Sequence, residues 1–153
     1  MQLRKFLSVL FTILLTSQYG YSQIIDDVGD GWKNKVEQAL QVIKTYDVEK
    51  YYFIQKHCTK VGYWLGEFAT IEPPHTILVP VSEMKKGCIN DIAAVLVHES
   101  LHLYYRYPET SIKLEEEEFK AYSYEYDFLM KIPNVQYWLI QHCVKMLEIY
   151  KIK

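Results

Sequence analysis

Residues 90–106 read NDIAAVLVHESLHLYYR, and the rest of the architecture can be worked out from this segment. Its aliphatic run is too apolar for a surface turn, and Asn90 or Asp91 is expected to cap the free amides at its amino end. Pro108 cannot continue a helix. The sequence therefore predicts a buried helix over residues 87–106, which the remaining elements must cover.

Two histidines lie four residues apart in this helix. His98 and His102 are turned by about 40° from each other and separated by about 6 Å along the axis, so both imidazoles can reach one ion. Glu99, one step further round, can reach a water on that ion. Zn²⁺ keeps a position for water, lowers its pKa towards about 7 and needs a carboxylate to accept the proton. The pattern predicts a zinc site with Glu99 as general base.

The segment His98-Glu99-Ser100-Leu101-His102 resembles the His-Glu-x-x-His motif of the zincin metallopeptidases. In that family an edge strand before the active-site helix binds the substrate backbone, and residues 76–81 stand in the corresponding place. Pro80 lacks a backbone donor, which also favours a sheet edge for this strand. The metzincin branch is excluded, because residues 103–108 contain neither glycine nor histidine. The gluzincin branch takes its third ligand from a glutamate on a following helix.

Four glutamates at positions 115–118 begin the next predicted helix, which should run from residue 114 to 132. Glu118 shares a helix face with Ala121, Phe128 and Leu129, whereas Glu117 falls on a polar stripe. A carboxylate on a core-facing stripe is costly unless it is paired or binds a metal. We therefore predict Glu118 as the third metal ligand and the three preceding glutamates as a solvated helix start.

The residues around Glu118 extend the resemblance. Gluzincins commonly have a small residue three positions after the ligand glutamate, as Ala121 is here, and residues 128–130 follow as in the peptidases related to ImmA and IrrE. The resemblance spans roughly residues 76–132. On the same inward face, Glu125 is either a hydrogen-bond partner of a ligand or a structural ion pair, and the residues leave both options open.

A peptidase also needs a donor for the developing oxyanion. The candidates in the sequence are Tyr104, Tyr105, Tyr107 and His142, and none is decisive. His142 falls on an apolar stripe of a third predicted helix, residues 134–150, which predicts a core histidine.

The remaining segments predict a small α+β domain. Apolar residues spaced by three and four indicate a helix over residues 30–46. Residues 51–68 are rich in aromatic and β-branched residues and are predicted as strand with a bend or a hairpin, and residues 76–81 as a short strand. Helices should cover one side of a short sheet. The resemblance implies a minimal zincin-like domain, with the edge strand packed against the active-site helix.

The amino terminus has the pattern of an export signal. Arg4 and Lys5 precede a ten-residue apolar run, and small residues then lead to Ser22. The run is about half of the ~20 residues that cross a bilayer, so we expect cleavage after Ser22 rather than stable membrane insertion. Residues 1–22 are then a signal peptide, residues 23–153 one domain, and the protein secreted or periplasmic.

Composition excludes several classes of protein. Half of the 153 residues are apolar, 24% are charged and 15% are aromatic, which argues against disorder and low complexity. Without the signal the chain has 15 basic and 19 acidic side chains. Its longest basic cluster is Lys85-Lys86, too little for a phosphate-binding face, so nucleic acid is not an expected partner.

Three cysteines follow the signal: Cys58, Cys88 and Cys143. An oxidising compartment permits one disulfide, and the sequence does not select among the three pairings. A catalytic cysteine needs a nearby base, and sequence neighbours do not establish one, so structural cysteines are favoured.

The export signal and the histidine spacing, together with the resemblance to zincins, imply an exported zinc peptidase of gluzincin type that acts on a peptide or protein substrate. His98, His102 and Glu118 hold the metal, and Glu99 is the general base. One alternative is a catalytically silent zincin-like domain that binds metal or another protein. Another is that the central helix is ordinary core and binds no metal.

Overall fold

The computed structural model describes residues 24–25, 31–72, 74–107 and 112–151. The predicted signal peptide and its cleavage position after Ser22 lie outside these residues. The elements are β1 (Ile24–Ile25), α2 (Trp32–Tyr46), α3 (Val48–His57), β2 (Lys60–Trp64), β3 (Thr70–Glu72), β4 (Thr76–Pro80), α4 (Val81–Lys86), α5 (Ile89–Arg106), α6 (Leu114–Leu129) and α7 (Tyr137–Tyr150).

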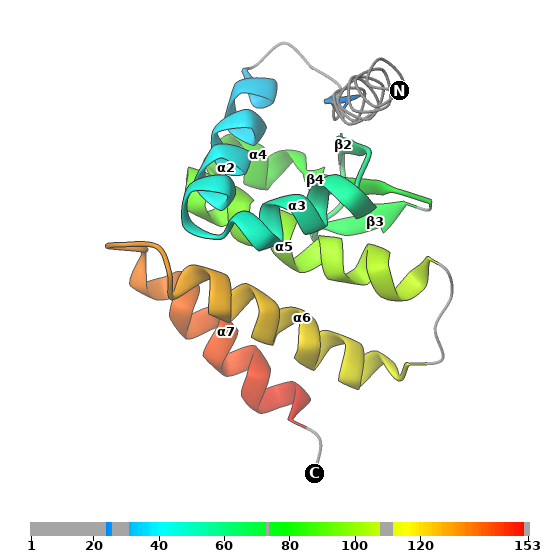
Figure 1. Ribbon diagram of the computed structural model, residues 1–153, viewed down its shortest axis with the longest axis vertical. Coiled ribbons are helices and arrows are strands. Elements are labelled where there is room, and N and C mark those ends of the chain that lie inside the picture. Colours follow the sequence, from blue (N-terminus) through cyan, green and yellow to red (C-terminus); the bar gives the residue numbers. More distant parts are fainter. Residues whose placement is uncertain (1–23, 26–30, 73, 108–111, 152–153) are drawn as a thin grey trace, which may run out of the picture.

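The predicted α+β class is confirmed (Figure 1). The strands form a mixed sheet in the order β1-β2-β4-β3, in which β3 alone runs antiparallel to its neighbour. The helices α6 and α7 lie side by side, and α6 packs against α5. None of the helices in the described ranges has the length and apolarity to cross a membrane.

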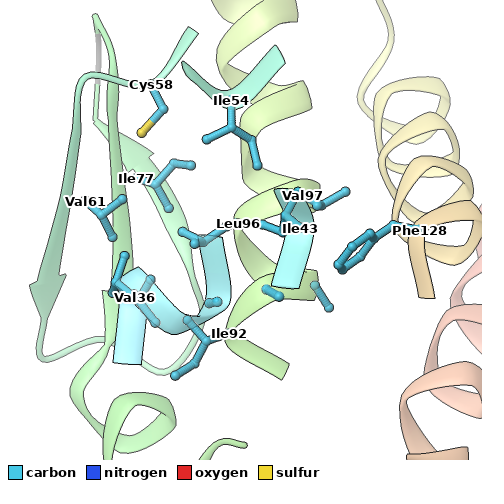
Figure 2. Packing of buried hydrophobic residues seen from close by; sticks show 14 of the residues in the cluster. Val36, Ile43, Ile54, Cys58, Val61, Ile77, Ile92, Leu96, Val97 and Phe128 are labelled. Atoms are coloured by element: carbon cyan, nitrogen blue, oxygen red, sulfur yellow. The ribbon is translucent and has the colours of Figure 1, made fainter. Parts of the chain in front are cut away.

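The helix α5 is the centre of the fold. Figure 2 shows the sheet on one side of α5 and α6 on the other. Ile77 of β4 and Leu96 of α5 are fully buried towards the sheet, and Phe128 of α6 is fully buried on the opposite side. The apolar run of residues 92–97 forms this core, as its composition predicts.

The other long helices agree with their apolar spacing. The predictions of residues 30–46, 114–132 and 134–150 correspond to α2, α6 and α7, with ends that differ by up to three residues. The predicted cap of α5 is wrong: Cys88 is the N-cap residue and makes no side-chain cap bond. Asn90 instead donates a hydrogen bond to Gln136 (3.0 Å), which joins the starts of α5 and α7.

The prediction of strand structure across residues 51–68 is wrong for its first half. The helix α3 occupies Val48–His57, and the strand β2 begins only at Lys60. Asp47 caps α3 through its side chain, and Ile54 is fully buried, so the aromatic residues before it lie on a helix. A short aromatic run does not by itself distinguish a helix from a strand.

The predicted edge position of the strand at residues 76–81 is also wrong, since β4 lies between β2 and β3. Pro80 is tolerated there because it is the last residue of β4, and the ladder with β3 covers only Thr76 to Leu78. Pro80 then serves as the N-cap residue of α4. The edge of the sheet on this side is β3.

Asp47, at the start of α3, links this helix to the segment that follows α6. Its carboxylate accepts a hydrogen bond from Lys131 Nζ just after the end of α6 (2.7 Å) and pairs with Lys50 Nζ (3.2 Å). Burial alone would raise the pKa of Asp47, but the bonds from these two lysines outweigh it and hold the pKa below its ordinary value of 3.8.

Replacing this carboxylate should destabilise the fold in a pH-dependent way. Asp47→Asn keeps a cap acceptor but loses the charge pairs, so the free energy of unfolding should fall by about 1–2 kcal/mol at pH 7. The depressed pKa stabilises the fold above about pH 4, and this contribution is lost as the pH falls through the folded pKa. Urea unfolding at pH 7 and pH 2.5 measures how much unfolding free energy Asp47→Asn loses at each pH, with Glu148→Gln, at an exposed position of α7, as control. An equal loss of unfolding free energy at both pH values would contradict this role of Asp47.

Candidate metal centre

Three predicted ligands converge between α5 and α6. His98 Nε2 and His102 Nε2 lie 3.1 Å apart. The Glu118 carboxylate places one oxygen 3.6 Å from His98 Nε2 and the other 3.5 Å from His102 Nε2. Both histidines are buried and Glu118 is half-buried. Within the described residues this is the one group of three or more such side chains with ligand atoms close enough to hold a metal, all within 4.8 Å of one another.

Each imidazole is oriented by a second carboxylate. His98 Nδ1 donates to Glu125 Oε2 (3.0 Å), and His102 Nδ1 donates to Glu117 Oε1 (2.5 Å). With the proton of each ring held at Nδ1, Nε2 is the atom left to bind an ion. Carboxylates in this position fix the tautomer and orientation of metal-binding histidines in many proteins. Glu125 is thus a hydrogen-bond partner of His98, and the same contact is an ion pair when the ring is protonated, so both options from the sequence stay open.

The donor set and its spacing fit Zn²⁺. Ligand bonds of 2.0–2.1 Å in a tetrahedron place neighbouring donor atoms about 3.3 Å apart. The two Nε2 atoms are 3.1 Å apart, and each lies within about 0.3 Å of that value from one of the two different Glu118 oxygens (3.6 and 3.5 Å). With one donor atom taken from each residue, the three atoms lie within 4.8 Å of one another. Two imidazole nitrogens and one carboxylate oxygen are also a ligand set of catalytic zinc sites, which leave one position for water.

The electrostatics of the site favour positive charge. Burial alone would lower the pKa of His98, but its bonds to Glu118 and Glu125 outweigh burial and raise the pKa to about 10. For His102, burial and the neighbouring His98 charge prevail and lower the pKa. The carboxylates of Glu118 and Glu125 therefore stabilise a positive charge on His98.

Glu99 lies beside the three converging side chains and lines the same cleft. It is buried, and this burial raises its pKa to about 7, with the Glu118 and Glu125 charges adding to the effect. A carboxylate with such a pKa can both accept and release a proton near neutral pH. Its position is thus compatible with the role of general base predicted from the sequence.

A cleft of about 720 Å³ opens onto these residues, a volume within the usual range of ligand pockets. One wall is α5, with His98, Glu99 and His102. The facing walls come from the edge strand β3, with Thr70 and Ile71, and from α6 and α7. The cleft therefore joins the candidate metal ligands to an unpaired sheet edge.

The hydrogen-bond donors that could stabilise an oxyanion near the site differ from those predicted. His142 is exposed and lines the cleft, so its prediction as a core histidine is wrong, because the buried stripe of α7 runs through Leu139 and Cys143. Tyr122 of α6 was missed; its ring lies 4.4 Å from that of His98, centroid to centroid. Burial raises the pKa of Tyr122, so its hydroxyl stays protonated and can donate.

The three predicted tyrosines near the end of α5 lie elsewhere. Tyr104 and Tyr107 make edge contacts with the rings of His57 and His75, respectively. Tyr105 stacks edge-on with Tyr104. None of the three lines the cleft.

The prediction of Glu117 as a solvated side chain is wrong. It is buried and accepts hydrogen bonds from His102 and from Arg106, whose Nε lies 2.9 Å from Glu117 Oε1. Glu117 and Glu118 precede the buried Ala121 by four and three residues, and both spacings share one helix face. From this spacing the buried position of Glu117 could have been predicted. Glu115 is exposed, and Glu116 pairs with Lys120 at the surface.

The cysteines are not among the candidate metal ligands, but the Cys143 thiol hydrogen-bonds to Glu125, the carboxylate that pairs with His98. All three are free, and Cys58 and Cys143 are buried, as expected of structural cysteines. Burial raises the pKa of Cys58 to about 11, so it is a thiol at neutral pH. The Cys58 thiol donates to the carbonyl of Lys60.

Comparison of the chain with protein-family models, with curated proteins and with solved structures finds no match. The resemblance to zincins therefore rests on His98, Glu99, His102 and Glu118. What these four residues can do follows from their geometry.

Proposed function

We propose that this chain is an exported zinc-dependent peptidase, a small zincin-like domain of gluzincin type. The observation that carries the proposal is the convergence of His98, His102 and Glu118, with each imidazole held at Nδ1 by its own carboxylate. A buried group of this kind is costly to assemble unless its charges are paired or it binds a cation, and here the Nε2 atoms and the Glu118 oxygens are the ones that an ion would join.

In this proposal His98 Nε2, His102 Nε2 and a Glu118 oxygen hold one Zn²⁺. When bound, the ion would lower the pKa of water to about 7 and polarise the carbonyl of a peptide bond. Glu125 and Glu117 keep the two imidazoles in the tautomer that leaves Nε2 unprotonated.

Glu99 moves the proton. One carboxylate oxygen of Glu99 takes a proton from the attacking water, and Glu99 then delivers it to the nitrogen of the leaving amine. Its burial among other carboxylates supports this role, because a pKa of about 7 suits both steps.

The substrate backbone is proposed to lie along β3. The zincin resemblance implies an edge strand that binds an extended peptide, and β3 rather than β4 is the edge strand beside the cleft. A peptide added to β3 would gain backbone hydrogen bonds at the open side of the sheet. This contact selects extended segments without demanding particular side chains.

A silent metal-binding domain is the alternative. The cleft favours the enzyme, because Tyr122 and His142 line it and offer donors for a developing oxyanion. The same cleft also offers the sheet edge and the candidate base Glu99.

A reconstitution experiment tests the proposal. The chain from residue 23 onward, stripped with a chelator and reloaded, should bind about one zinc and cleave a mixture of unstructured peptides, with new amino termini counted by an amine-reactive fluorophore. Activity should disappear with the chelator and return with zinc. Bound zinc without new amino termini would support the silent domain, and absence of bound zinc would identify α5 as ordinary core.

A further inference from the structure

Arg106 makes an ion pair on the side of α5 that faces the candidate metal site. It is the last residue of α5 and follows His102 by four positions, so the two side chains share a helix face. Its Nε donates to Glu117 Oε1 at 2.9 Å. The Arg106 side chain is 45% exposed, whereas that of Glu117 is 6% exposed. The cation is therefore near solvent and its carboxylate partner is inside.

Glu117 Oε1 is also the atom that accepts the His102 hydrogen bond (2.5 Å). One buried oxygen thus receives two donors, one from Arg106 and one from His102. The guanidinium bond fixes the position of this carboxylate oxygen, because an arginine donates in a rigid planar geometry. The fixed oxygen in turn holds the His102 ring with Nδ1 towards Glu117, which leaves Nε2 directed at the candidate site.

The other histidine lacks this arrangement. His98 Nδ1 donates to Glu125, and within the described part of the chain no arginine or lysine pairs with Glu125. The two candidate ligands therefore differ in what lies behind their carboxylates. Arg106 lies behind the carboxylate of His102 and not behind that of His98, although its charge also acts on Glu118 and Glu99.

We infer that Arg106 is a positioning residue for metal binding, which acts on His102 through Glu117. The inference depends on the metal site of the proposed function but not on peptide hydrolysis. Arg106 fixes the Glu117 carboxylate, Glu117 fixes the His102 ring, and the ring presents Nε2 to the ion.

A double-mutant cycle on zinc affinity tests this chain of contacts. The dissociation constant for zinc is measured by competition with a chromophoric chelator for wild type, Arg106→Gln, Glu117→Gln and the double variant. Loss of an outer carboxylate partner costs about 10–100-fold in metal affinity, so Glu117→Gln should fall in that range and Arg106→Gln should lose about tenfold. The double variant should match Glu117→Gln within about twofold, because Arg106 then has no carboxylate to pair with and only a neutral amide oxygen remains.

Lys120→Gln is the matched control. Lys120 is 42% exposed and pairs with Glu116, the neighbour of Glu117, but that pair does not touch a histidine. Its zinc affinity should stay within about twofold of wild type, and the visible spectrum of its Co²⁺-loaded form should be unchanged. The spectrum of Arg106→Gln should change, since the His102 ring is no longer fixed.

Three results would overturn the inference. The first is an unchanged zinc affinity in Arg106→Gln. The second is that Arg106→Gln weakens zinc binding as much in the Glu117→Gln variant as in wild type. The third is that Lys120→Gln weakens zinc binding as much as Arg106→Gln does. If circular dichroism shows that Arg106→Gln is unfolded, Arg106→Lys replaces it in the cycle and should weaken zinc binding by at least threefold. A wild-type chain without zinc affinity overturns the inference and the proposed function together. Zinc affinity that follows the cycle without any hydrolysis contradicts only the peptidase.

Discussion

Glu99→Gln is expected to retain about one zinc per chain and to lose peptide hydrolysis by about 10²–10⁴-fold in kcat. Glutamine has nearly the shape of glutamate but cannot accept the proton of the attacking water. Because Glu99 is not among the three converging ligands, its replacement should leave the metal in place. Initial rates on a fluorogenic peptide, with zinc content measured on the same samples, give both values.

The control for this variant is Glu67→Gln. Glu67 also lines the cleft but is exposed on the segment between β2 and β3, so its replacement removes a charge from the same cleft without touching α5. Its kcat should stay within about threefold of wild type. Equal rates for wild type and Glu99→Gln would eliminate this residue as the base, and equal losses in both variants would mean that only cleft charge matters.

Glu118→Ala is expected to weaken zinc binding by more than about 100-fold, beyond the loss expected for an outer-shell carboxylate. Its carboxylate lies 3.5–3.6 Å from both Nε2 atoms, so it is the oxygen donor of the candidate site. Two imidazoles alone leave the ion with fewer protein ligands than catalytic zinc sites use. Chelator competition measures the change, and zinc content after dialysis should fall well below one per chain.

Glu116→Ala is the matched control for this substitution. Glu116 lies in the same turn of α6 and pairs with Lys120 at the surface. Its removal should leave zinc affinity within about twofold. If Glu118→Ala bound zinc as tightly as Glu116→Ala does, the third ligand would have to be another side chain.

The helices could be predicted where apolar spacing extended over many residues. Residues 92–97 required a buried helix, and their run gave α5 its central place in the core. The strand prediction for residues 51–57 was wrong because aromatic residues suit strands and helices alike. In the structure this segment belongs to α3, which Asp47 caps. The predicted edge position of β4 was wrong because a proline at the end of a strand removes only its own hydrogen bond. The order of strands in the sheet depends on long-range pairing.

The candidate site could be predicted in its inner part. His98 and His102 share a helix face by spacing alone, and the inward position of Glu118 followed from Ala121 and Phe128. The carboxylates that pair with the two histidines were harder to predict, because one helix face is wide enough to take both Glu117 and Glu118. Contacts across helices, such as Arg106 with Glu117, depend on how α5 and α6 dock, which spacing within one helix does not reveal.

Binding of one divalent cation by three side chains of α5 and α6 can be seen in a crystal structure of the zinc-loaded chain from residue 23. Anomalous diffraction would be recorded above and below the zinc absorption edge. One anomalous peak is expected at about 2.0–2.2 Å from His98 Nε2, His102 Nε2 and a Glu118 oxygen. A map without a peak between the two imidazoles, or with the Glu118 carboxylate turned away from the ion, would contradict this binding.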